Sequence, residues 1–317
     1  MQSFSVLLTG GLGQVGSYLC EELLGNGHDV VILDNMSSTV NICPEKAKFV
    51  KGDIRDKKTV EELMRDSDAV IHCAAQIFVT YSIENPLFDA ENNVIGTLNL
   101  LDAARNSDIK RFVYFSSAAV YGDPVRLPVD ETHPQDPMSP YGVSKLSGEK
   151  YALAFNKIYG LPSTAIRPFN IYSPRQDPSN PYSGVISKFI DRAGSGMNPI
   201  IFGDGSATRD FVSVHDVVDM VMLMLEKEAA VGKVFNCGTG NITRIDELAR
   251  TVIELYGKPG LEPEFLAERP GDIKYSYADI SRAKKLLGYE PKVALRDGLI
   301  DMIEFKKMNQ AKSTDAQ

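Results

Sequence analysis

A glycine-rich turn near the start of the chain restricts the fold more than any other feature. The apolar segment Val6–Thr9 predicts a buried strand, and three glycines then follow at three-residue spacing within Gly10–Gly16. Glycines in this pattern let bare backbone N–H groups, at the positive end of a helix, approach a pyrophosphate. A second apolar strand, Val30–Leu33, leads to Asp34, whose carboxylate can bind a ribose diol. This order of elements predicts a dinucleotide-binding α/β domain.

The composition limits the possible partners of the chain. With 317 residues, the chain can bury a large core in one domain or two. Its formal net charge of −8 disfavours nucleic acid as a partner, because phosphate backbones bind basic faces. No apolar run approaches the roughly 18 residues that a membrane span needs, so we expect no membrane partner.

The cysteines and the first residues indicate a cellular compartment. Cys20, Cys43, Cys73 and Cys237 are far apart and lack metal-binding spacing, so we expect free thiols and no metal site. No basic segment followed by a long apolar run stands at the start, so we expect no signal peptide. Both features favour the reducing cytoplasm.

Segments typical of strands and helices alternate through the first half of the chain. The predicted strands after Asp34 are 48–51, 69–72, 111–116 and 163–167, and the predicted helices are 59–64, 86–105 and 141–159. This alternation predicts an α/β fold, with a Rossmann-type parallel sheet and helices on both faces. Ligands bind such sheets at the carboxyl ends of the strands.

The pattern changes near Ser173, where a loop rich in proline and polar residues begins. We therefore predict an NAD-binding Rossmann domain in 1–172, with a return segment at about 213–240, and a smaller α/β substrate-binding lobe in 173–212 and 241–306. The lobe is expected to contain a helix at 245–256 and short helices up to about Lys306. The polar residues 307–317 are expected to form a frayed tail.

Tyr141 and Lys145 lie four residues apart in a predicted helix, so both side chains project from one face. A nearby ammonium lowers the pKa of a phenol from its usual value near 10, which would make Tyr141 available as a base. Ser117, at the end of a predicted strand, supplies a hydroxyl that can share a substrate proton. The same spacing occurs by chance in many helices. The glycine-rich turn upstream is what favours a catalytic role here.

These motifs together resemble those of the extended short-chain dehydrogenase/reductase family, and within it the UDP-hexose 4-epimerase group. The resemblance covers roughly Ser5 to Lys306. Besides the motifs above, it is carried by Gly52-Asp53-Ile54, His72-Cys73-Ala74-Ala75, Asn93 before Gly96-Thr97, Ser116–Gly122, Arg167-Pro168-Phe169-Asn170, Gly203-Asp204-Gly205 with Arg209-Asp210, Asn236-x-Gly238 and Arg269-Pro270-Gly271-Asp272.

The resemblance implies a role for each site residue. NAD would be the cofactor, because Asp34 would repel the 2′-phosphate of NADP. The residues that would bind NAD are Gly10, Gly13, Gln14, Val15, Gly16, Asp34, Asn35, Asp53, Ile54, Ala74, Ala75, Asn93, Tyr141, Lys145 and Phe169. Those that would bind a UDP-sugar are Phe78, Ser117, Tyr141, Asn170, Gly184, Val185, Ile186, Ile201, Phe202, Arg209, Arg269, Asp272 and Ser276. Ser117, Tyr141 and Lys145 would be catalytic.

The implied reaction is a transient oxidation of the sugar at C4, with hydrogen returned to the opposite face. Ser276 stands where a tyrosine restricts some family members to UDP-glucose and UDP-galactose, so UDP-GlcNAc and UDP-GalNAc are also candidates. Phe78 stands where a small residue usually lines the sugar pocket, so it could narrow the site or admit a uronic acid or deoxy-sugar. Ala118 and Ala119 replace the acidic pair that family members use to dehydrate sugars.

Other interpretations stay open at this point. A uronate epimerase, a UDP-glucuronate decarboxylase or an unusual dehydratase would share most of these motifs. Arg209 beside Asp210 would also fit a surface ion pair. A non-catalytic NAD-binding scaffold would be expected to lack one of the three catalytic residues, and all three are present. The resemblance also implies a homodimer packed through the helices near 86–105 and 141–159.

Overall fold

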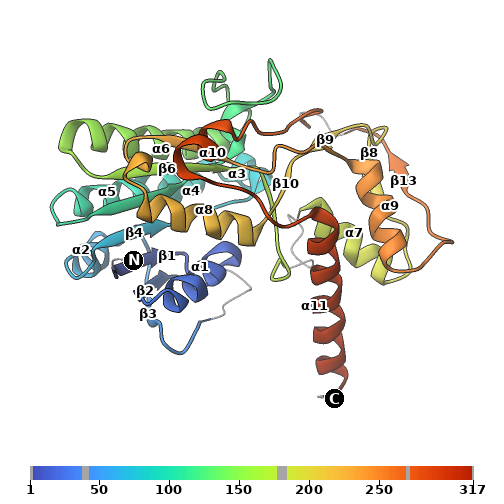
Figure 1. Cartoon of the computed structure of the whole chain (residues 1–317), viewed down its shortest axis with the longest axis horizontal. Helices are drawn as coiled ribbons and strands as arrows, with labels where there is room; N and C mark the ends of the chain where they lie inside the picture. The colour runs from blue at the N-terminus through green and yellow to red at the C-terminus, as the bar shows by residue number, and fades with distance from the viewer. Residues whose placement is uncertain (1–2, 38–42, 177–183, 269–271, 316–317) are drawn as a thin grey trace.

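A parallel sheet forms the centre of the larger part of the molecule (Figure 1). The computed structural model describes residues 3–37, 43–176, 184–268 and 272–315. Seven of the described strands form this sheet in the order β11-β6-β5-β4-β1-β2-β3, with every neighbouring pair parallel. They are β1 (Ser5–Thr9), β2 (Asp29–Asp34), β3 (Lys48–Lys51), β4 (Ala69–His72), β5 (Arg111–Phe115), β6 (Ser163–Pro168) and β11 (Val234–Cys237). The predicted α/β class is confirmed.

Helices cover both faces of the sheet, as the alternation predicts. On one face lie α1 (Gln14–Gly25), α8 (Val214–Glu226) and α10 (Ser281–Leu287), which share a hydrophobic core with the strands. On the other face lie α2 (Lys57–Met64), α5 (Gly96–Ala104) and α6 (Pro140–Tyr159), around a second core. Two short helices, α3 (Val79–Glu84) and α4 (Pro86–Ala90), follow β4 and pack against α6.

A smaller lobe stands beside the sheet and has a core of its own (Figure 1). Its helices are α7 (Val185–Gly194), α9 (Ile245–Leu255) and α11 (Leu295–Asp315). Three pairs of short strands lie in the lobe and in the segments that lead to it: β7 (Asn170–Tyr172) with β10 (Phe211–Ser213), β8 (Ile200–Phe202) with β13 (Glu264–Leu266), and β9 (Thr208–Arg209) with β12 (Thr243–Arg244). Between these segments, α8 and β11 return to the main sheet. The exact division of the chain into lobes stays a prediction.

Two elements differ from the sequence-based expectation. The predicted helix at 86–105 is interrupted by a π-helical turn, Glu91–Ile95, which directs Asn92 and Asn93 into the protein. Helix α11 is a single long helix that continues to Asp315, so most of the segment expected to fray from Lys307 is helical. Its last turns contain no proline or glycine, and Lys, Met, Gln and Ala favour helix propagation.

None of the helices in the described part of the chain combines the length and apolar character that crossing a bilayer requires. The described residues also contain no group of three or more His, Cys, Asp or Glu side chains arranged to hold a metal ion.

Candidate active site

The glycine-rich turn between β1 and α1 has a shape that only glycine allows. Gly10 has a positive φ of 69°, and a Cβ there would lie 2.7 Å from the backbone nitrogen of Ala74. A Cβ on Gly16 would lie 2.1 Å from the carbonyl oxygen of Gly10. The turn therefore packs tightly against both the first turn of α1 and the exit of β4.

The start of α1 has unsatisfied hydrogen-bond donors. Gly13 is its N-cap and provides no side-chain cap. The buried Nε2 of Gln14 has no hydrogen-bond partner among the described residues. Free backbone N–H groups, an orphaned amide and the positive end of a helix fit the diphosphate of a dinucleotide. Val15, next in the same turn, is half-buried.

Asp34 lies at the end of β2 and holds the turn in place. Its carboxylate accepts hydrogen bonds from the backbone nitrogens of Leu12, at 3.0 Å, and of Met36, at 2.7 Å. Each carboxylate oxygen still has lone-pair capacity, so these bonds leave room for a ribose hydroxyl. Asp34 therefore has a structural role besides the predicted one.

The next acidic residue, Asp53, follows β3 and is paired with Arg55. The Nε and Nη2 atoms of Arg55 lie 2.9 and 2.8 Å from its carboxylate oxygens. Hydrogen bonding from Arg55 lowers the pKa of Asp53. Asn35 contacts the same carboxylate at 3.5 Å, so these two predicted cofactor residues are neighbours. Ile54 is buried where Gly96 allows close packing.

The exit of β4 is held by the π-helical turn. Asn93 accepts a hydrogen bond from the backbone nitrogen of Gln76, at 2.8 Å, and its amide donates to Gln76, Asp89 and Ser144. Its side chain is thus fully engaged within the protein. Asn93 therefore positions the loop with Ala74 and Ala75, and any effect of this residue on a cofactor acts through that loop.

The start of α6 places Tyr141. The hydroxyl of Ser139 caps the helix by accepting from the backbone nitrogen of Gly142, and Pro140 occupies the first turn, where it is well tolerated. A Cβ on Gly142 would lie 2.8 Å from the carbonyl oxygen of Ala119. Glycine thus lets α6 approach the short 3₁₀ turn that follows Ser117, and this contact brings Ser117 and Tyr141 together.

Burial dominates the electrostatics of these residues. Burial raises the pKa of Tyr141, while its interaction with the Ser117 hydroxyl acts in the opposite direction. Burial also lowers the pKa of Lys145 to about 8, and its ammonium lies 4.8 Å from the centre of the Tyr114 ring. The expected lowering of the Tyr141 pKa by Lys145 is thus wrong for the ligand-free chain. Desolvation of the phenol is the largest cause of its raised pKa, and the lowering contribution comes from Ser117.

Two of the predicted diphosphate-binding residues, Asn170 and Arg209, lie on β7 and β9, which flank Asp210 and β10. The side-chain amide of Asn170 donates to the carbonyl oxygen of Asp210, at 3.2 Å. Arg209 donates to the carbonyl oxygens of Thr208 and Lys274, and burial lowers its pKa. The carboxylate of Asp210 instead receives bonds from the 239–240 turn and from Ala278. Arg209 and Asp210 therefore do not form the alternative surface ion pair.

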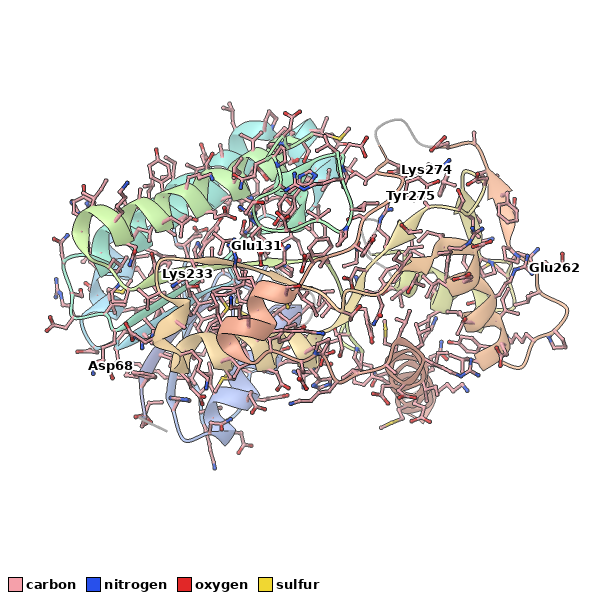
Figure 2. The ribbon with its side chains drawn as sticks, turned by 45° about the horizontal axis from the view of Figure 1, so that its top comes forward. Asp68, Glu131, Lys233, Glu262, Lys274 and Tyr275 are labelled. Carbon is pink, nitrogen blue, oxygen red and sulfur yellow. The ribbon has the colours of Figure 1, made fainter. Side chains whose placement is uncertain are left out.

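The backbone of Ser276 lies beside the strand of Arg209, because its nitrogen donates to the carbonyl oxygen of Thr208 at 3.2 Å. The preceding residues, Lys274 and Tyr275, lie on the segment that runs between the two parts of the molecule (Figure 2). Asp272, on the same segment, is exposed, and its negative charge partly offsets the lowering of the Arg209 pKa by burial. Arg269 lies outside the described residues.

The remaining predicted substrate residues differ in exposure. Ile186 and Ile201 are buried in the core of the smaller lobe, so their side chains have no surface to offer a ligand. Gly184 and Phe202 are exposed and Val185 is half-buried. Phe78 is half-buried at the start of α3, and Phe169 is a core residue whose ring lies near Tyr121.

Sequence reasoning missed two residues that hold this site. The hydroxyl of Ser82 accepts from the backbone nitrogen of Tyr141 at 3.1 Å. Glu149 is fully buried on α6 and bonds Ser116 and Arg167. No sequence signal indicates Ser82. Glu149 could have been found, because it continues the four-residue spacing of Tyr141 and Lys145.

Comparisons with known proteins identify relatives along almost the whole chain. A family model described as the NAD dependent epimerase/dehydratase family matches residues 6–238. A protein named a putative UDP-glucose 4-epimerase, from Methanocaldococcus jannaschii, is 43% identical over 308 residues, which make up 96% of this chain and 99% of that protein.

Two solved structures superpose closely. The UDP-glucose 4-epimerase of Thermotoga maritima, determined with UDP-glucose, has a TM-score of 0.92 and 37% identity, covering 96% of this chain and 99% of that one. The UDP-N-acetylglucosamine 4-epimerase of Methanobrevibacter ruminantium, in complex with UDP-N-acetylmuramic acid, also has a TM-score of 0.92. It is 34% identical and covers 98% of this chain and 100% of that one.

Proposed function

The chain belongs to the NAD-dependent epimerase/dehydratase family, and we propose that it interconverts UDP-hexoses by inverting C4 through a transient 4-keto sugar, with NAD as cofactor. UDP-glucose and UDP-galactose are the first candidate pair, and UDP-GlcNAc and UDP-GalNAc are the second. The match to relatives named as 4-epimerases, over nearly the full length of both chains, supports this reaction.

The observation that carries the proposal is the meeting of Ser117, Tyr141 and Lys145 at the edge of the sheet where the glycine-rich turn also lies. Tyr141, aided by the hydroxyl of Ser117, takes the proton of the sugar 4-hydroxyl and later returns it. Lys145, one turn after Tyr141 on the same face of α6, would hold the cofactor ribose. NAD, when bound, supplies the oxidant that accepts the C4 hydrogen with its electron pair and gives it back.

The substrate is held by its diphosphate. Arg209 is half-buried and its guanidinium donates only to backbone oxygens among the described residues, so it retains donors for phosphate oxygens. Asn170 and Arg269 would complete this grip, and Asp272 would contact the uridine ribose. A sugar held only through its diphosphate can turn over between oxidation and reduction, which inversion at C4 requires.

A serine at position 276 is small enough to leave room for a 2-acetamido group, and its backbone nitrogen bonds the carbonyl oxygen of Thr208, the residue before Arg209. The similarity to a protein named a UDP-N-acetylglucosamine 4-epimerase supports the same extension. Ala118 and Ala119 lack the acid and base of a dehydratase, so a uronate epimerase or a decarboxylase is the stronger second candidate. Phe78 is the residue that would decide between these sugars.

We further propose that the enzyme works in the cytoplasm as a homodimer. All four cysteines are free, as expected in a reducing compartment. Large apolar side chains are exposed along α3, α4 and α6, among them Ile83, Leu87 and Ile158. Exposed apolar surface of this kind is typical of a protein interface.

The test is incubation of the purified protein with a panel of UDP-sugars, with the products analysed by NMR. We expect a reversible mixture of two C4 epimers with no net NADH. A pentose product with release of CO₂ would instead identify a decarboxylase, and a 6-deoxy-4-keto sugar a dehydratase. Tyr141→Phe should lower turnover by about 10²-fold or more while NAD stays bound, and full activity of this variant would reject Tyr141 as the base.

A further inference from the structure

An ion pair is completely buried behind the proposed catalytic residues. The side chains of Glu149, on α6, and Arg167, on β6, are 0% and 1% exposed. The Nη2 and Nε atoms of Arg167 donate to the two carboxylate oxygens of Glu149 at 2.6 and 2.8 Å. Burying two charges is unfavourable unless further hydrogen bonds satisfy both groups. The remaining partners of this pair therefore show what it holds in place.

Two of those partners lie at the ends of the segment that carries Ser117, and a third is the carbonyl oxygen of Glu131, 3.5 Å from Nη1 of Arg167. The hydroxyl of Ser116, directly before Ser117, donates to Glu149 at 2.7 Å. The Nη1 atom of Arg167 donates to the hydroxyl of Tyr121 at 2.7 Å, and the guanidinium lies 4.7 Å from the centre of the Tyr121 ring. Tyr121 ends the 3₁₀ turn that Ser117 caps. The ion pair thus fixes both ends of the segment 116–121.

The same pair connects this segment to the helix of the other two catalytic residues. Glu149 lies four residues after Lys145 and eight after Tyr141, so all three share one face of α6. Helix α6 therefore meets the segment 116–121 at two points, through Glu149 and through the close approach of Gly142 to Ala119.

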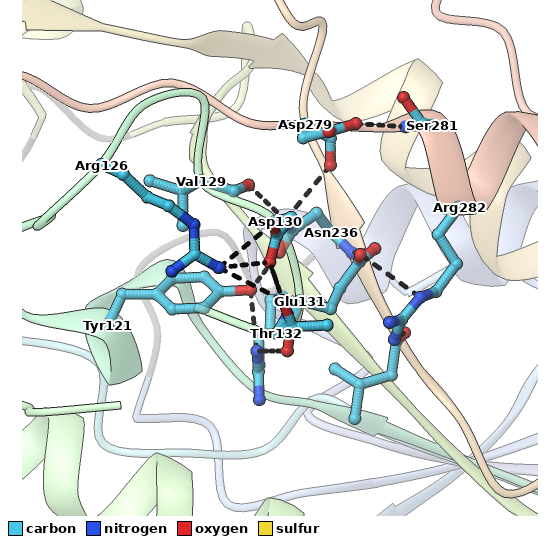
Figure 3. Close-up of polar contacts among 12 residues, drawn as sticks. Tyr121, Arg126, Val129, Asp130, Glu131, Thr132, Asn236, Asp279, Ser281 and Arg282 are labelled. Carbon is cyan, nitrogen blue, oxygen red and sulfur yellow. Dashed lines mark hydrogen bonds and ion pairs between the residues drawn. The ribbon is translucent and has the colours of Figure 1, made fainter. Parts of the chain in front are cut away.

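A chain of hydrogen bonds extends from Tyr121 to the far side of the sheet (Figure 3). Its hydroxyl donates to Oδ1 of Asn236, on β11, at 2.6 Å. The backbone nitrogen of Asn236 donates to the carboxylate of Glu131, which forms an ion pair with Arg282 of α10 at 3.4 Å. The segment 116–121 is thus anchored on α6, β6, β11 and α10.

We propose that the Glu149–Arg167 pair is a positioning element for the proposed epimerisation, which sets the separation of the Ser117 and Tyr141 hydroxyls. The proposal rests on the proposed function for its kinetic readout only. Glu149 and Arg167 act through Ser116 and Tyr121. Removing either contact should let the segment 116–121 shift relative to α6, which would misalign the two hydroxyls without changing the residues that bind ligands.

The test uses single-atom changes, because removing one charge of the buried pair could prevent folding. Ser116→Ala and Tyr121→Phe each remove one hydroxyl contact of the pair. Ser163→Ala is the matched control for the first, since Ser163 is a fully buried serine that links β6 to the Ala152 carbonyl of α6 away from the site. Tyr289→Phe is the control for the second, since its buried hydroxyl donates to the carbonyl oxygen of Gly238.

We expect Ser116→Ala and Tyr121→Phe to lower kcat by about ten- to a hundredfold with KM for the UDP-hexose changed by less than about twofold and NAD content unchanged. The two controls should lower the melting temperature by similar amounts and leave kcat nearly unchanged. Equal kcat losses in variants and controls would overturn the proposal.

Crystal structures of the NAD-bound wild type and of both variants give a second readout that needs no turnover. The distance between the Ser117 and Tyr141 hydroxyl oxygens should differ from the wild type in both variants, and an unchanged distance would overturn the positioning role. If the wild-type protein converts no UDP-hexose, the proposed function fails. The crystallographic distances still decide this inference.

Discussion

At the scale of single residues, Asp34 has two functions that the sequence shows only in part. It ends β2 where a ribose would bind, and its carboxylate also fastens the glycine-rich turn through Leu12 and the β2 exit through Met36. Two backbone N–H groups depend on this one side chain. A substitution at Asp34 should therefore affect the ligand-free protein as well as cofactor binding.

Asp34→Ala should weaken NAD binding and lower the free energy of unfolding of the ligand-free protein by about 1–3 kcal/mol, because buried donors lose their charged acceptor. Urea unfolding of cofactor-free protein and titration with NAD measure the two effects separately. Asp53→Ala is the control for the unfolding measurement, since Asp53 is less buried than Asp34 and pairs with a partly exposed arginine. Stability equal to the wild type in Asp34→Ala would contradict the structural role.

The depressed pKa of Lys145 predicts a pH dependence. Burial lowers this pKa from 10.5 to about 8, so the ammonium is lost as the pH rises through about 8. We expect kcat/KM, which reports groups of the free enzyme, to fall above about pH 8. The guanidinium of Lys145→Arg stays charged. The kcat/KM of this variant should therefore be lower than that of the wild type but should not decline above about pH 8.

Loss of the Lys145 proton should change stability in the direction opposite to activity, so the free energy of unfolding should rise where kcat/KM falls. Between about pH 8 and 10.5 the unfolded chain holds the Lys145 proton that the folded chain has released. The contribution of Lys145 to the free energy of unfolding therefore rises with pH in this range. Activity that falls only together with denaturation would contradict the assignment to Lys145.

At the scale of elements, α6 depends on glycines for its close contacts. Alanine in place of a helical glycine normally stabilises a protein by about 1 kcal/mol. In α6 we expect the opposite sign: Gly142→Ala should lower the free energy of unfolding by about 1–3 kcal/mol and also reduce kcat, because the new methyl group would contact the carbonyl oxygen of Ala119.

Gly25→Ala in α1 provides the comparison. In the described part of the chain, no atom lies within 4 Å of the position that its Cβ would occupy, so Gly25→Ala should be neutral or stabilising. Chemical denaturation and steady-state kinetics of the two variants decide the question. Stabilisation of Gly142→Ala to the level of Gly25→Ala would show that α6 does not need this close approach.

The sequence predicts most elements well because their signals are local. The proline at 140 and the serine before it mark the start of α6, and the apolar runs of β1, β2 and β4 are bounded by turn residues. The π-helical turn at Glu91–Ile95 has no such signal. Its cause is the burial of Asn92 and Asn93 against distant residues, which no local pattern contains.

The candidate site, like the fold, could be predicted from the sequence only where its geometry is local. Spacing along the chain indicates Tyr141, Lys145 and the glycines, because their geometry is set within one element. The contacts of Arg209 and Asp210 depend on two separate strand pairs, β7–β10 and β9–β12, and the role of Asp210 in fixing the 239–240 turn follows only from the fold. The lowered pKa of Lys145 is likewise a consequence of burial by several elements.

At the scale of the whole molecule, exposed apolar side chains of the larger part form the surface through which we propose that the homodimer packs. Leu87 on α4 is 80% exposed, and Ile83, Val143 and Ile158 on the neighbouring α3 and α6 are at least half exposed. These helices carry or support Tyr141. A second copy on this face would therefore stiffen α6 without adding residues to the site.

A charge placed in this surface should separate the proposed dimer. Leu87→Arg combined with Ile158→Arg would force guanidinium groups into the interface, where desolvation makes them unfavourable. Light scattering at micromolar concentration should show a dimer for the wild type and a monomer for the double variant. Ile242→Arg, at a similarly exposed isoleucine of the smaller lobe, should stay dimeric.

The monomer should retain measurable kcat, because every described site residue comes from one chain, but it should melt at a lower temperature. A wild-type monomer, or a double variant that still dimerises, would place the interface elsewhere or remove it.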